Sequence, residues 1–280
     1  MDNMNLNNKL SHLKALLEHM GDALVAFSGG VDSTLLLKVA HDVLGEKAAA
    51  ITAVSPLSSH TDWEDAVAMT ELIGAVHYQI NSDDLKYPEF TANTPDKCYH
   101  CKKRRLNLLR QIAGEKGFHD VLDGTNRDDF NDYRPGLKAV QELGIRSPLS
   151  ESGLNKEEIR WLSRQFGLPT WDKPSFACLA SRVPYGDAIT SEKLGQIDRG
   201  ETFLRGLGVC RQLRVRHHGA VARIEVEPHA IHQFMDADIR GRIADFFRKI
   251  GFQFVTLDIE GYSMGSLNRG ILSKEKHQNG

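Results

Sequence analysis

Short apolar runs alternate with stretches of helical periodicity along the first 166 residues of the chain. Leu10, Leu13 and Leu17 illustrate the helical stretches, since residues three or four positions apart share one face of a helix. The run ALVAF at residues 23–27 illustrates the strands, since continuous apolar residues are typical of a strand buried on both faces. These patterns predict strands over residues 23–27, 48–54, 75–80 and 120–123, and helices over residues 6–19, 32–44, 62–73, 101–116 and 155–166. Alternation of this kind favours an α/β fold with a doubly wound parallel sheet.

Residues 168–190 have no clear period and are rich in proline, serine and glycine. An irregular segment of this length in a compact chain is usually functional or a linker. Beyond it the pattern predicts helices over residues 191–206 and 229–249 and strands over residues 211–217, 221–227 and 252–257, with a turn at His218–Gly219. We therefore expect two domains, a larger α/β domain over residues 1–187 and a smaller α+β domain over residues 188–280.

The composition is that of a globular chain that can bury a sizeable core, with 41% hydrophobic and 26% charged residues among 280. Lysine and arginine total 35 against 37 aspartate and glutamate residues, a net charge of −2 that disfavours nucleic acid as a partner. The first twenty residues carry no continuous apolar stretch, and the chain has no apolar run of about 18 residues, so we expect neither a secretory leader nor a membrane span. Four cysteines are too few for a secreted disulfide scaffold, and we expect a cytoplasmic protein.

The turn between the first predicted strand and the next helix has the composition of an anion-binding site. Glycines let backbone N–H groups approach phosphate oxygens, and the helix N-terminus adds a partial positive charge. Ser28 and Ser33 can add hydroxyl donors, whereas Asp32 would repel a phosphate and is better suited to hold a magnesium ion that bridges phosphates. A plain turn whose serine and glycine satisfy the helix end is the alternative. The candidate residues are Ala26, Phe27, Ser28, Gly29, Gly30, Asp32 and Ser33.

A second candidate stretch, LDGTN at residues 122–126, follows a later predicted strand. Ligands of doubly wound sheets collect at the carboxyl ends of the strands, and Gly124 permits a close backbone approach there. Gly124 and Asn126 are therefore candidate nucleotide contacts. The alternative is an ordinary Asp-Gly turn.

Three of the four cysteines form a candidate metal site. Cys98 and Cys101 are a C-x-x-C pair just before a predicted helix, and Cys178 lies in the irregular segment. Three thiolates cannot close a four-cysteine zinc site, but they can hold three irons of a [4Fe–4S] cluster and leave the fourth open for sulfide or substrate. The alternatives are a zinc site completed by His100, a Cys98–Cys101 disulfide, and three unconnected cysteines. We interpret Cys210 as a small buried apolar residue.

A basic run, Lys102, Lys103, Arg104 and Arg105, follows the cysteine pair on the predicted helix. Consecutive residues lie on different faces of a helix, so most of this run is expected on a solvated face. Lys102, next to Cys101, is the best candidate to reach a nucleotide phosphate or the charge that develops during a reaction.

Two further sets of polar residues suit an anion. Ser181 and Arg182 form an anion-binding pair in the irregular segment. Arg214 and Arg216 share one face of a predicted strand, because strand side chains repeat every two residues, and can bind a phosphate or carboxylate. Surface ion pairing with Glu225 on the neighbouring strand is an equal alternative.

Residues 26–33 resemble the PP-loop of the ATP pyrophosphatase family, and match neither of the two common glycine-rich nucleotide motifs, G-x-x-x-x-G-K-[ST] and G-x-G-x-x-G. The resemblance implies cleavage of ATP to AMP and pyrophosphate. It also implies activation of a carboxylate, amide or carbonyl oxygen by adenylation, followed by displacement of AMP by nitrogen or sulfur. In that family the end of the next strand, here Thr52 and Val54, contacts adenine through its backbone.

Wider motifs resemble the LarE family, over about residues 5–270. They are NTPD at residues 93–96, NDYRPG at 131–136, KPSFACLASRVPYG at 173–186 and RVR at 214–216. The resemblance implies adenylation of a carboxylate of pyridinium-3,5-biscarboxylic acid mononucleotide with ATP and Mg²⁺, then sulfur insertion to give a thiocarboxylate. This chemistry contributes to making the nickel-pincer nucleotide cofactor.

The LarE resemblance also assigns roles to residues. Members with one cysteine give up its sulfur, whereas members with three hold a [4Fe–4S] cluster with a transferable sulfide, which here implies Cys98, Cys101 and Cys178 as ligands. The substrate phosphate is expected at Ser181, Arg182, Glu201, Arg214 and Arg216. Lys102 and Asp32 complete the expected catalytic set with Cys178. LarE proteins assemble as hexamers, so we expect a homo-oligomer.

Three other functions are also compatible with the sequence. A cluster-dependent PP-loop tRNA sulfurtransferase is the nearest, although the net charge of −2 disfavours it. An amide ligase of the NAD synthetase type would need no cluster. A non-catalytic redox or zinc regulator that senses ATP would bind nucleotide without releasing pyrophosphate.

Overall fold

The computed structural model describes residues 3–131, 135–174 and 177–263. It divides into two compact units, one made of Met1–Phe90 and Pro95–Phe176 and the other of Thr91–Thr94 and Ala177–Gly280. This division differs from the boundary expected near residue 188, because it assigns the irregular segment from Ala177 onward to the smaller unit.

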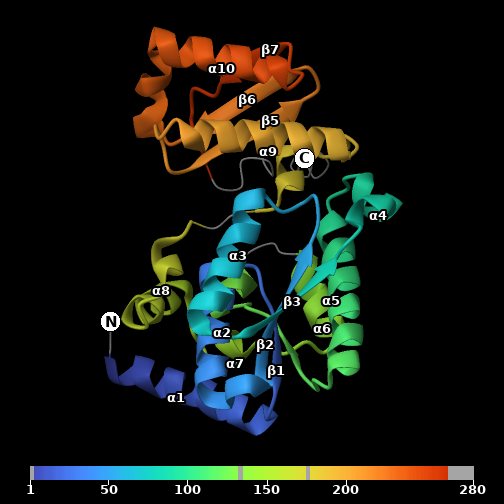
Figure 1. The fold of residues 1–280 in the computed structure, drawn as a ribbon, viewed down its shortest axis with the longest axis vertical. Coiled ribbons are helices and arrows are strands. Elements are labelled where there is room, and N and C mark those ends of the chain that lie inside the picture. The colour runs from blue at the N-terminus through green and yellow to red at the C-terminus, as the bar shows by residue number, and fades with distance from the viewer. Residues whose placement is uncertain (1–2, 132–134, 175–176, 264–280) are drawn as a thin grey trace, which may run out of the picture. The chain divides into compact units, whose positions relative to one another are not determined.

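The larger unit is built on a parallel sheet with the strand order β3-β2-β1-β4, of which Figure 1 labels β1, β2 and β3. Its strands are β1 Ala23–Ala26, β2 Ala48–Val54, β3 Val76–Asn81 and β4 Val121–Leu122. β1 pairs in parallel with both β2 and β4, so Val25 lies beside Ala50 and Leu122. The chain therefore winds outward from β1 in two directions, and the carboxyl ends of β1 and β4 meet at one edge of the sheet. The predicted doubly wound α/β fold is confirmed.

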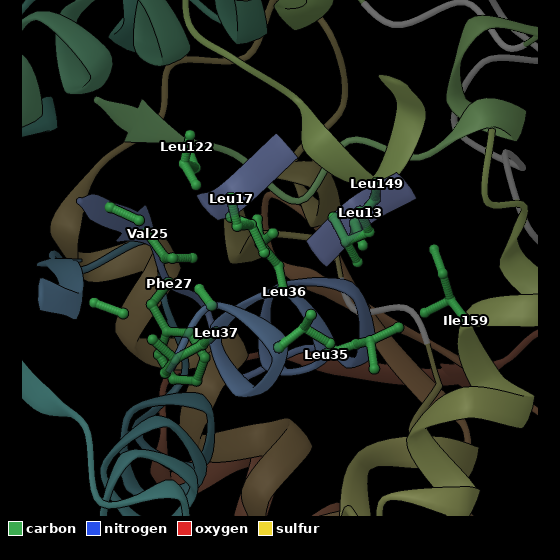
Figure 2. Close-up of a cluster of buried hydrophobic side chains, with 14 of the residues drawn as sticks. Leu13, Leu17, Val25, Phe27, Leu35, Leu36, Leu37, Leu122, Leu149 and Ile159 are labelled. Carbon is green, nitrogen blue, oxygen red and sulfur yellow. The ribbon is translucent and has the colours of Figure 1, made fainter. Parts of the chain in front are cut away.

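Helices cover both faces of this sheet, because alternate residues of its strands point to opposite sides. Val25 packs into a core with Leu13 and Ile159 (Figure 2), whereas Leu24 packs into a second core with Leu106. The first face carries α1 Asn3–Met20, α2 Val31–Leu44, α3 His60–Ile73, α7 Pro148–Glu151 and α8 Lys156–Gln165, and the second carries α5 Lys97–Lys116 and α6 Pro135–Glu142.

Side-chain caps determine where two of these helices begin. Ser59 accepts a hydrogen bond from the Asp62 N–H at the start of α3, and the Asp62 carboxylate accepts the Ser59 N–H in return. Asn155 and Glu158 form the same reciprocal pair at the start of α8, with both bonds at 2.9 Å. Gly74 ends α3 in the left-handed conformation that glycine adopts without strain.

The smaller unit packs two helices on a three-stranded sheet with the order β5-β6-β7. Its elements are α9 Ser191–Gly206, β5 Leu213–His218, β6 Val221–Val226, α10 Ala237–Lys249 and β7 Phe254–Leu257. β5 and β6 are antiparallel, and β7 joins β6 in parallel. The single helix predicted over residues 229–249 is wrong, because Asp236 accepts the N–H groups of Asp238 and Ile239 and starts a new helix there.

Several short elements could not be predicted from apolar periodicity, because they span too few residues to show a period. They are α4 Pro88–Thr91, α7, α6 and the 3-10 helices η1 Gly45–Lys47, η2 Asp84–Lys86, η3 Arg127–Asn131, η4 Pro169–Asp172, η5 Leu179–Arg182 and η6 Pro228–Met235. Among the helices of the described residues, none combines the length and apolar character that crossing a membrane requires.

Candidate functional site

The glycine turn after β1 is packed too closely for any other residue at Gly29. Gly29 has φ +66°, and a Cβ atom there would lie 2.9 Å from the backbone of Ala66 in α3. Gly30 is the N-cap of α2, and Phe27 holds the start of the turn by donating its N–H to Ile51 in β2. The backbone therefore runs past the N-terminus of α2 in the way an anion site requires.

Ser28 and Ser33 close this turn through long hydrogen bonds. The Ser33 hydroxyl accepts the Ser28 N–H at 3.3 Å and lies 3.2 Å from the Ser28 hydroxyl. The Gly30 N–H reaches the Ser28 hydroxyl at 3.4 Å. Bonds of this length lie at or beyond the usual limit and are weak, so a phosphate oxygen can replace them at small cost.

Asp32 contacts two residues from distant parts of the sequence. Its Oδ1 atom accepts a hydrogen bond from the Asn126 amide at 3.2 Å, and its Oδ2 atom forms an ion pair with Lys156 at 2.5 Å. The structure thus joins two predicted site residues, Asp32 and Asn126. Sequence reasoning missed Lys156, whose only local signal is its place directly after the cap residue Asn155.

Gly124 brings the loop after β4 against the start of α2. A Cβ atom at Gly124 would lie 3.1 Å from the Ser33 nitrogen and 3.3 Å from the Asp32 Cβ. The two candidate stretches, 26–33 and 122–126, are therefore in contact. This is the carboxyl edge at which ligands of doubly wound sheets bind.

Lys102 forms an ion pair with Asp123, at 2.8 Å between Nζ and Oδ2. Asp123 is buried and also accepts hydrogen bonds from the Ser147 hydroxyl and from Thr125. Burial opposes ionisation, but the Lys102 ammonium and these hydrogen bonds outweigh it and hold the pKa of Asp123 below its usual value. Lys102 is therefore anchored at the end of β4, next to the glycine turn.

Thr52 and Val54 lie on the carboxyl half of β2. The Thr52 hydroxyl donates to the Phe27 carbonyl at 2.9 Å, and lies 2.8 Å from Nε2 of His77. The Val54 carbonyl accepts the Ser82 N–H at 2.8 Å. Thr52 therefore ties β2 to the residue that leads into the glycine turn.

Lys173 is a second site residue that sequence reasoning missed. Its ammonium donates to the Gly29 carbonyl at 3.1 Å and forms an ion pair with Asp65 of α3 at 2.7 Å. Lys173 opens the KPSFACLASRVPYG motif, so the motif itself was the available signal. Residues 132–134 and 175–176 of the quoted motifs lie outside the described residues.

The cysteine pair lies inside the first turns of α5, and not just before a helix as predicted. Cys98 is exposed, whereas Cys101 is half-buried and donates its thiol hydrogen to Asp84 at 3.6 Å. Residues three apart share one face of a helix, so the two cysteines lie on the same side of α5. Cys178 is exposed and belongs to the smaller unit. Within the described part of the chain, no three His, Cys, Asp or Glu residues form a group able to hold a metal ion.

The side chains of the basic run are partly exposed, between 24% and 41%, and each also forms an ion pair. Arg104 and Arg105 both bind Asp84, each at 2.6 Å, and Arg105 also donates to Ser55 at the end of β2. Burial opposes the ionisation of Asp84, but the two arginines lower its pKa. Lys103 pairs with Glu142 of α6.

In the smaller unit, Glu201 is fully buried within a group of arginines. It pairs with Arg182 and Arg205, both at 2.8 Å, and accepts the Val215 N–H at 3.1 Å. Although burial opposes ionisation, the Arg182 charge lowers the pKa of Glu201. Arg182 also donates to Ser181 at 2.8 Å.

Arg214 and Arg216 of β5 are buried beside this group. Arg216 pairs with Glu225 at 2.7 Å and donates to the Ser181 carbonyl at 2.8 Å. The pairing with Glu225, which the sequence left as an equal alternative, is present, but both partners are buried and do not lie at the surface. Burial and the Arg182 charge lower the pKa of Arg214 to about 10. The arginines of this group outnumber its buried carboxylates, Glu201 and Glu225. The excess positive charge favours the binding of an anion.

Asn93 holds the irregular segment of the smaller unit. It has φ +55°, and its amide nitrogen lies within 3.2 Å of the carbonyls of Val183, Pro184 and Asp187. The Asn93 carbonyl accepts the Gly186 N–H. One buried side chain thus organises the turn that follows Cys178 and Arg182.

Comparison with known proteins first defines the class. The chain is 24% identical to one polypeptide of the glutamine-hydrolysing GMP synthase of Archaeoglobus fulgidus over 188 residues, which are 63% of the chain and 59% of that polypeptide. The parallel sheet and the glycine turn between β1 and α2 are the parts that define PP-loop nucleotide-binding proteins. The larger unit is a domain of this class.

Two relatives cover almost the whole chain. An uncharacterised protein of Synechocystis sp. is 46% identical over 269 residues, 96% of the chain and 100% of the relative. The pyridinium-3,5-bisthiocarboxylic acid mononucleotide synthase of Lactiplantibacillus plantarum is 39% identical over 264 residues, 94% of the chain and 95% of the relative. No family model matches the chain. The chain belongs to the family of this synthase, the LarE family.

Proposed function

We propose that the protein is an ATP-dependent sulfur transferase that acts on pyridinium-3,5-biscarboxylic acid mononucleotide. The enzyme would adenylate a carboxylate of this substrate, release pyrophosphate, and replace AMP by sulfur to give a thiocarboxylate. The observation that carries the proposal is the family membership over 94% of the chain, in a protein whose glycine turn contacts the loop after β4.

The larger unit would bind ATP. The turn formed by residues 28–33 would bind the phosphates, and Thr52, Val54, Gly124 and Asn126 would contact the nucleotide. Asp32 would supply one carboxylate for Mg²⁺. This ion is usually bound by one or two carboxylates together with substrate phosphates and water. Lys102 would stabilise the charge that develops at the α-phosphate.

The smaller unit would bind the substrate phosphate. The guanidinium groups would come from Arg182, Arg214 and Arg216, and Ser181 would add a hydroxyl. The ion pair with Glu201 holds Arg182 in position. A buried arginine with a pKa lowered to about 10 gains stability when a dianion arrives, which supports this assignment for Arg214.

On the resemblance to three-cysteine LarE proteins, Cys98, Cys101 and Cys178 would be the ligands of a [4Fe–4S] cluster. Two thiols lie on one face of α5, and all three are exposed or half-exposed. A cluster held by three cysteines would supply a transferable sulfide at its fourth iron. By the same family argument we propose that the enzyme is a homo-oligomer, a hexamer.

Anaerobic purification tests the cluster, with an absorption spectrum and iron and sulfide assays on wild type, Cys178→Ala and Cys98→Ala. Cys210→Ala is the matched control, because Cys210 is half-buried in the apolar core of the smaller unit. Wild type and Cys210→Ala should show a broad absorption band at about 400 nm, typical of thiolate-bound clusters, and the other two variants should lack it. A colourless wild type without iron overturns the cluster and leaves Cys178 as a sacrificial donor.

Pyrophosphate release tests the adenylation. Wild type should release pyrophosphate from ATP when the pyridinium mononucleotide is added, and Asp32→Ala should not. Full release by Asp32→Ala contradicts the proposal. Release that depends on tRNA and not on the mononucleotide favours a tRNA sulfurtransferase instead.

A further inference from the structure

Lys156 occupies a position that a lysine does not favour by itself. It is the first residue of α8, where the helix dipole places partial positive charge. Its backbone is fixed there, since its N–H donates to Asp128 at 2.9 Å and the preceding Asn155 caps the helix. The ammonium of Lys156 is directed at Asp32, and this contact accounts for a cation at an unfavourable end of the helix.

Both oxygens of Asp32 are engaged in the structure. Asn126 donates to Oδ1 and Lys156 binds Oδ2, while the Asp32 side chain keeps 23% of its surface exposed. Each carboxylate oxygen has a second lone pair, so a magnesium ion that binds Asp32 would lie within a few ångströms of both partners. The Asn126 amide is neutral, whereas the Lys156 ammonium repels a divalent cation, so Lys156 is the partner that leaves.

The other two lysines at this edge are not in the same situation. Lys102 is paired with Asp123, and Lys173 with Asp65 and the Gly29 carbonyl. Neither Asp123 nor Asp65 is part of the proposed magnesium site. Of these three lysines, Lys156 is thus the one whose ion-pair partner, Asp32, is proposed to bind the metal when the nucleotide binds.

We propose that Lys156 is an exchangeable cation of the ATP site. Without nucleotide it neutralises Asp32. When Mg²⁺ and ATP bind, Mg²⁺ takes over Oδ2 of Asp32, and the Lys156 ammonium moves to an oxygen of the nucleotide phosphates. This inference rests on the proposed function, because it requires ATP and Mg²⁺ at the glycine turn. It makes Lys156 a nucleotide-binding residue and a competitor of the free metal.

Those two roles predict opposite effects of one substitution. Lys156→Met should weaken the binding of MgATP, measured by calorimetry, by roughly tenfold, the loss of one charge-assisted hydrogen bond. The same substitution should strengthen binding of Mn²⁺, a paramagnetic substitute for Mg²⁺, to the nucleotide-free protein, measured by electron paramagnetic resonance. Removing a merely structural lysine would not tighten metal binding.

Lys38→Met is the matched control, because Lys38 forms a comparable lysine–aspartate pair with Asp42 on α2, also at 2.5 Å. It should leave both affinities unchanged. Lys156→Arg keeps the cation and should retain MgATP affinity within a few-fold. Thermal unfolding of each variant establishes that it is folded.

The outcomes separate the inference from the proposed function. If wild type binds MgATP and Lys156→Met binds it equally well, or binds Mn²⁺ no better than wild type does, the inference is overturned and the function stands. If wild type binds no MgATP, the proposed function fails, and the inference fails with it.

Discussion

The ammonium of Lys102 lies 2.8 Å from the carboxylate of Asp123, which is 5% exposed. This contact joins the first turns of α5, where Cys98 and Cys101 lie, to the end of β4 and the loop that contacts the glycine turn. The proposed sulfur-carrying and ATP-binding parts of the larger unit are therefore connected by one ion pair. Its charge state matters for both.

Asp123→Asn should destabilise the protein by about 3 kcal/mol at neutral pH, because it leaves Lys102 without its partner at a partly buried site. The native pKa of Asp123 lies below the value of about 4 in the unfolded chain. The stabilisation is thus complete above about pH 4 and is lost as the pH falls through the native pKa. The free energy of unfolding, measured with urea, should differ between wild type and variant, and this difference should become smaller below about pH 4. A gap that widens in acid contradicts the assignment.

Gly29→Ala should abolish MgATP binding and destabilise the fold. The left-handed φ alone costs about 1 kcal/mol for alanine, and the new Cβ would also push against the Ala66 backbone at 2.9 Å. Gly117→Ala is the control, since Gly117 has φ +80° but no atom lies within 4 Å of the position that its Cβ would take. Thermal unfolding should show a larger loss for Gly29→Ala. Equal losses would mean that close packing against α3 is unimportant.

His77 should make stability depend on pH near neutrality. Its ring contacts the Thr52 hydroxyl and stacks on Trp63, and burial lowers its pKa below about 6.5. A lowered histidine pKa means that stability is complete above the unfolded value and is lost as the pH falls below it. The stability gap between wild type and His77→Gln should shrink between about pH 7 and pH 5.5.

His119 provides a control of opposite sign. It is exposed and hydrogen-bonded to Asp22, which raises its pKa. Its contribution should be complete at low pH and lost as the pH rises through the native value. His119→Gln should therefore widen the gap to wild type on acidification. The same trend for both variants would contradict the contrast between the two histidines.

Asn93→Ala should release the turn at residues 183–187 in the smaller unit. The variant loses the amide that faces three carbonyls, a cost of about 2 kcal/mol, and places alanine at φ +55°. Asn93→Gly also lacks the amide, but glycine adopts this φ without strain, so the variant loses the hydrogen bonds alone. If the hydrogen bonds are the main contribution, both variants should show faster limited proteolysis of this turn. Full protection in Asn93→Gly would show that only the conformation matters.

The fold and the core of the site could be predicted because their signals are local. The bounds of β2 and α9 agree with their apolar periodicity, and the SGGVDS turn is continuous in sequence. The partners of this turn are not local: Lys156 reaches Asp32 across 124 positions. No periodicity links two such residues, because their contact depends on how α8 packs on α2.

The ion pairs of the basic run could not be predicted for the same reason. Arg104 and Arg105 look solvated when only their own helix is considered. Both bind Asp84, which lies 20 and 21 positions before them in the chain. Burial of Asp84 is a property of the packed unit and leaves no pattern in the sequence. By contrast, the Asp236 cap that divides the helix predicted over residues 229–249 was a local signal that the apolar periodicity obscured.

Glu201→Gln should give the largest loss of stability in the smaller unit, about 3 kcal/mol or more. Glu201 is fully buried against Arg182 and Arg205, and removing one partner of a buried ion pair leaves uncompensated charge. Glu192→Gln, at an exposed position on the same helix, is the control and should change stability little.

The same variant tests whether this arginine group is an anion site. With Glu201 neutral, the arginines lack a counter-charge, and inorganic phosphate that binds among them should restore part of the lost stability. Melting temperature should therefore rise more with added phosphate in Glu201→Gln than in wild type or Glu192→Gln. Equal rises in all three proteins would mean that phosphate acts elsewhere, and would remove the support that buried positive charge gives to substrate binding in this unit.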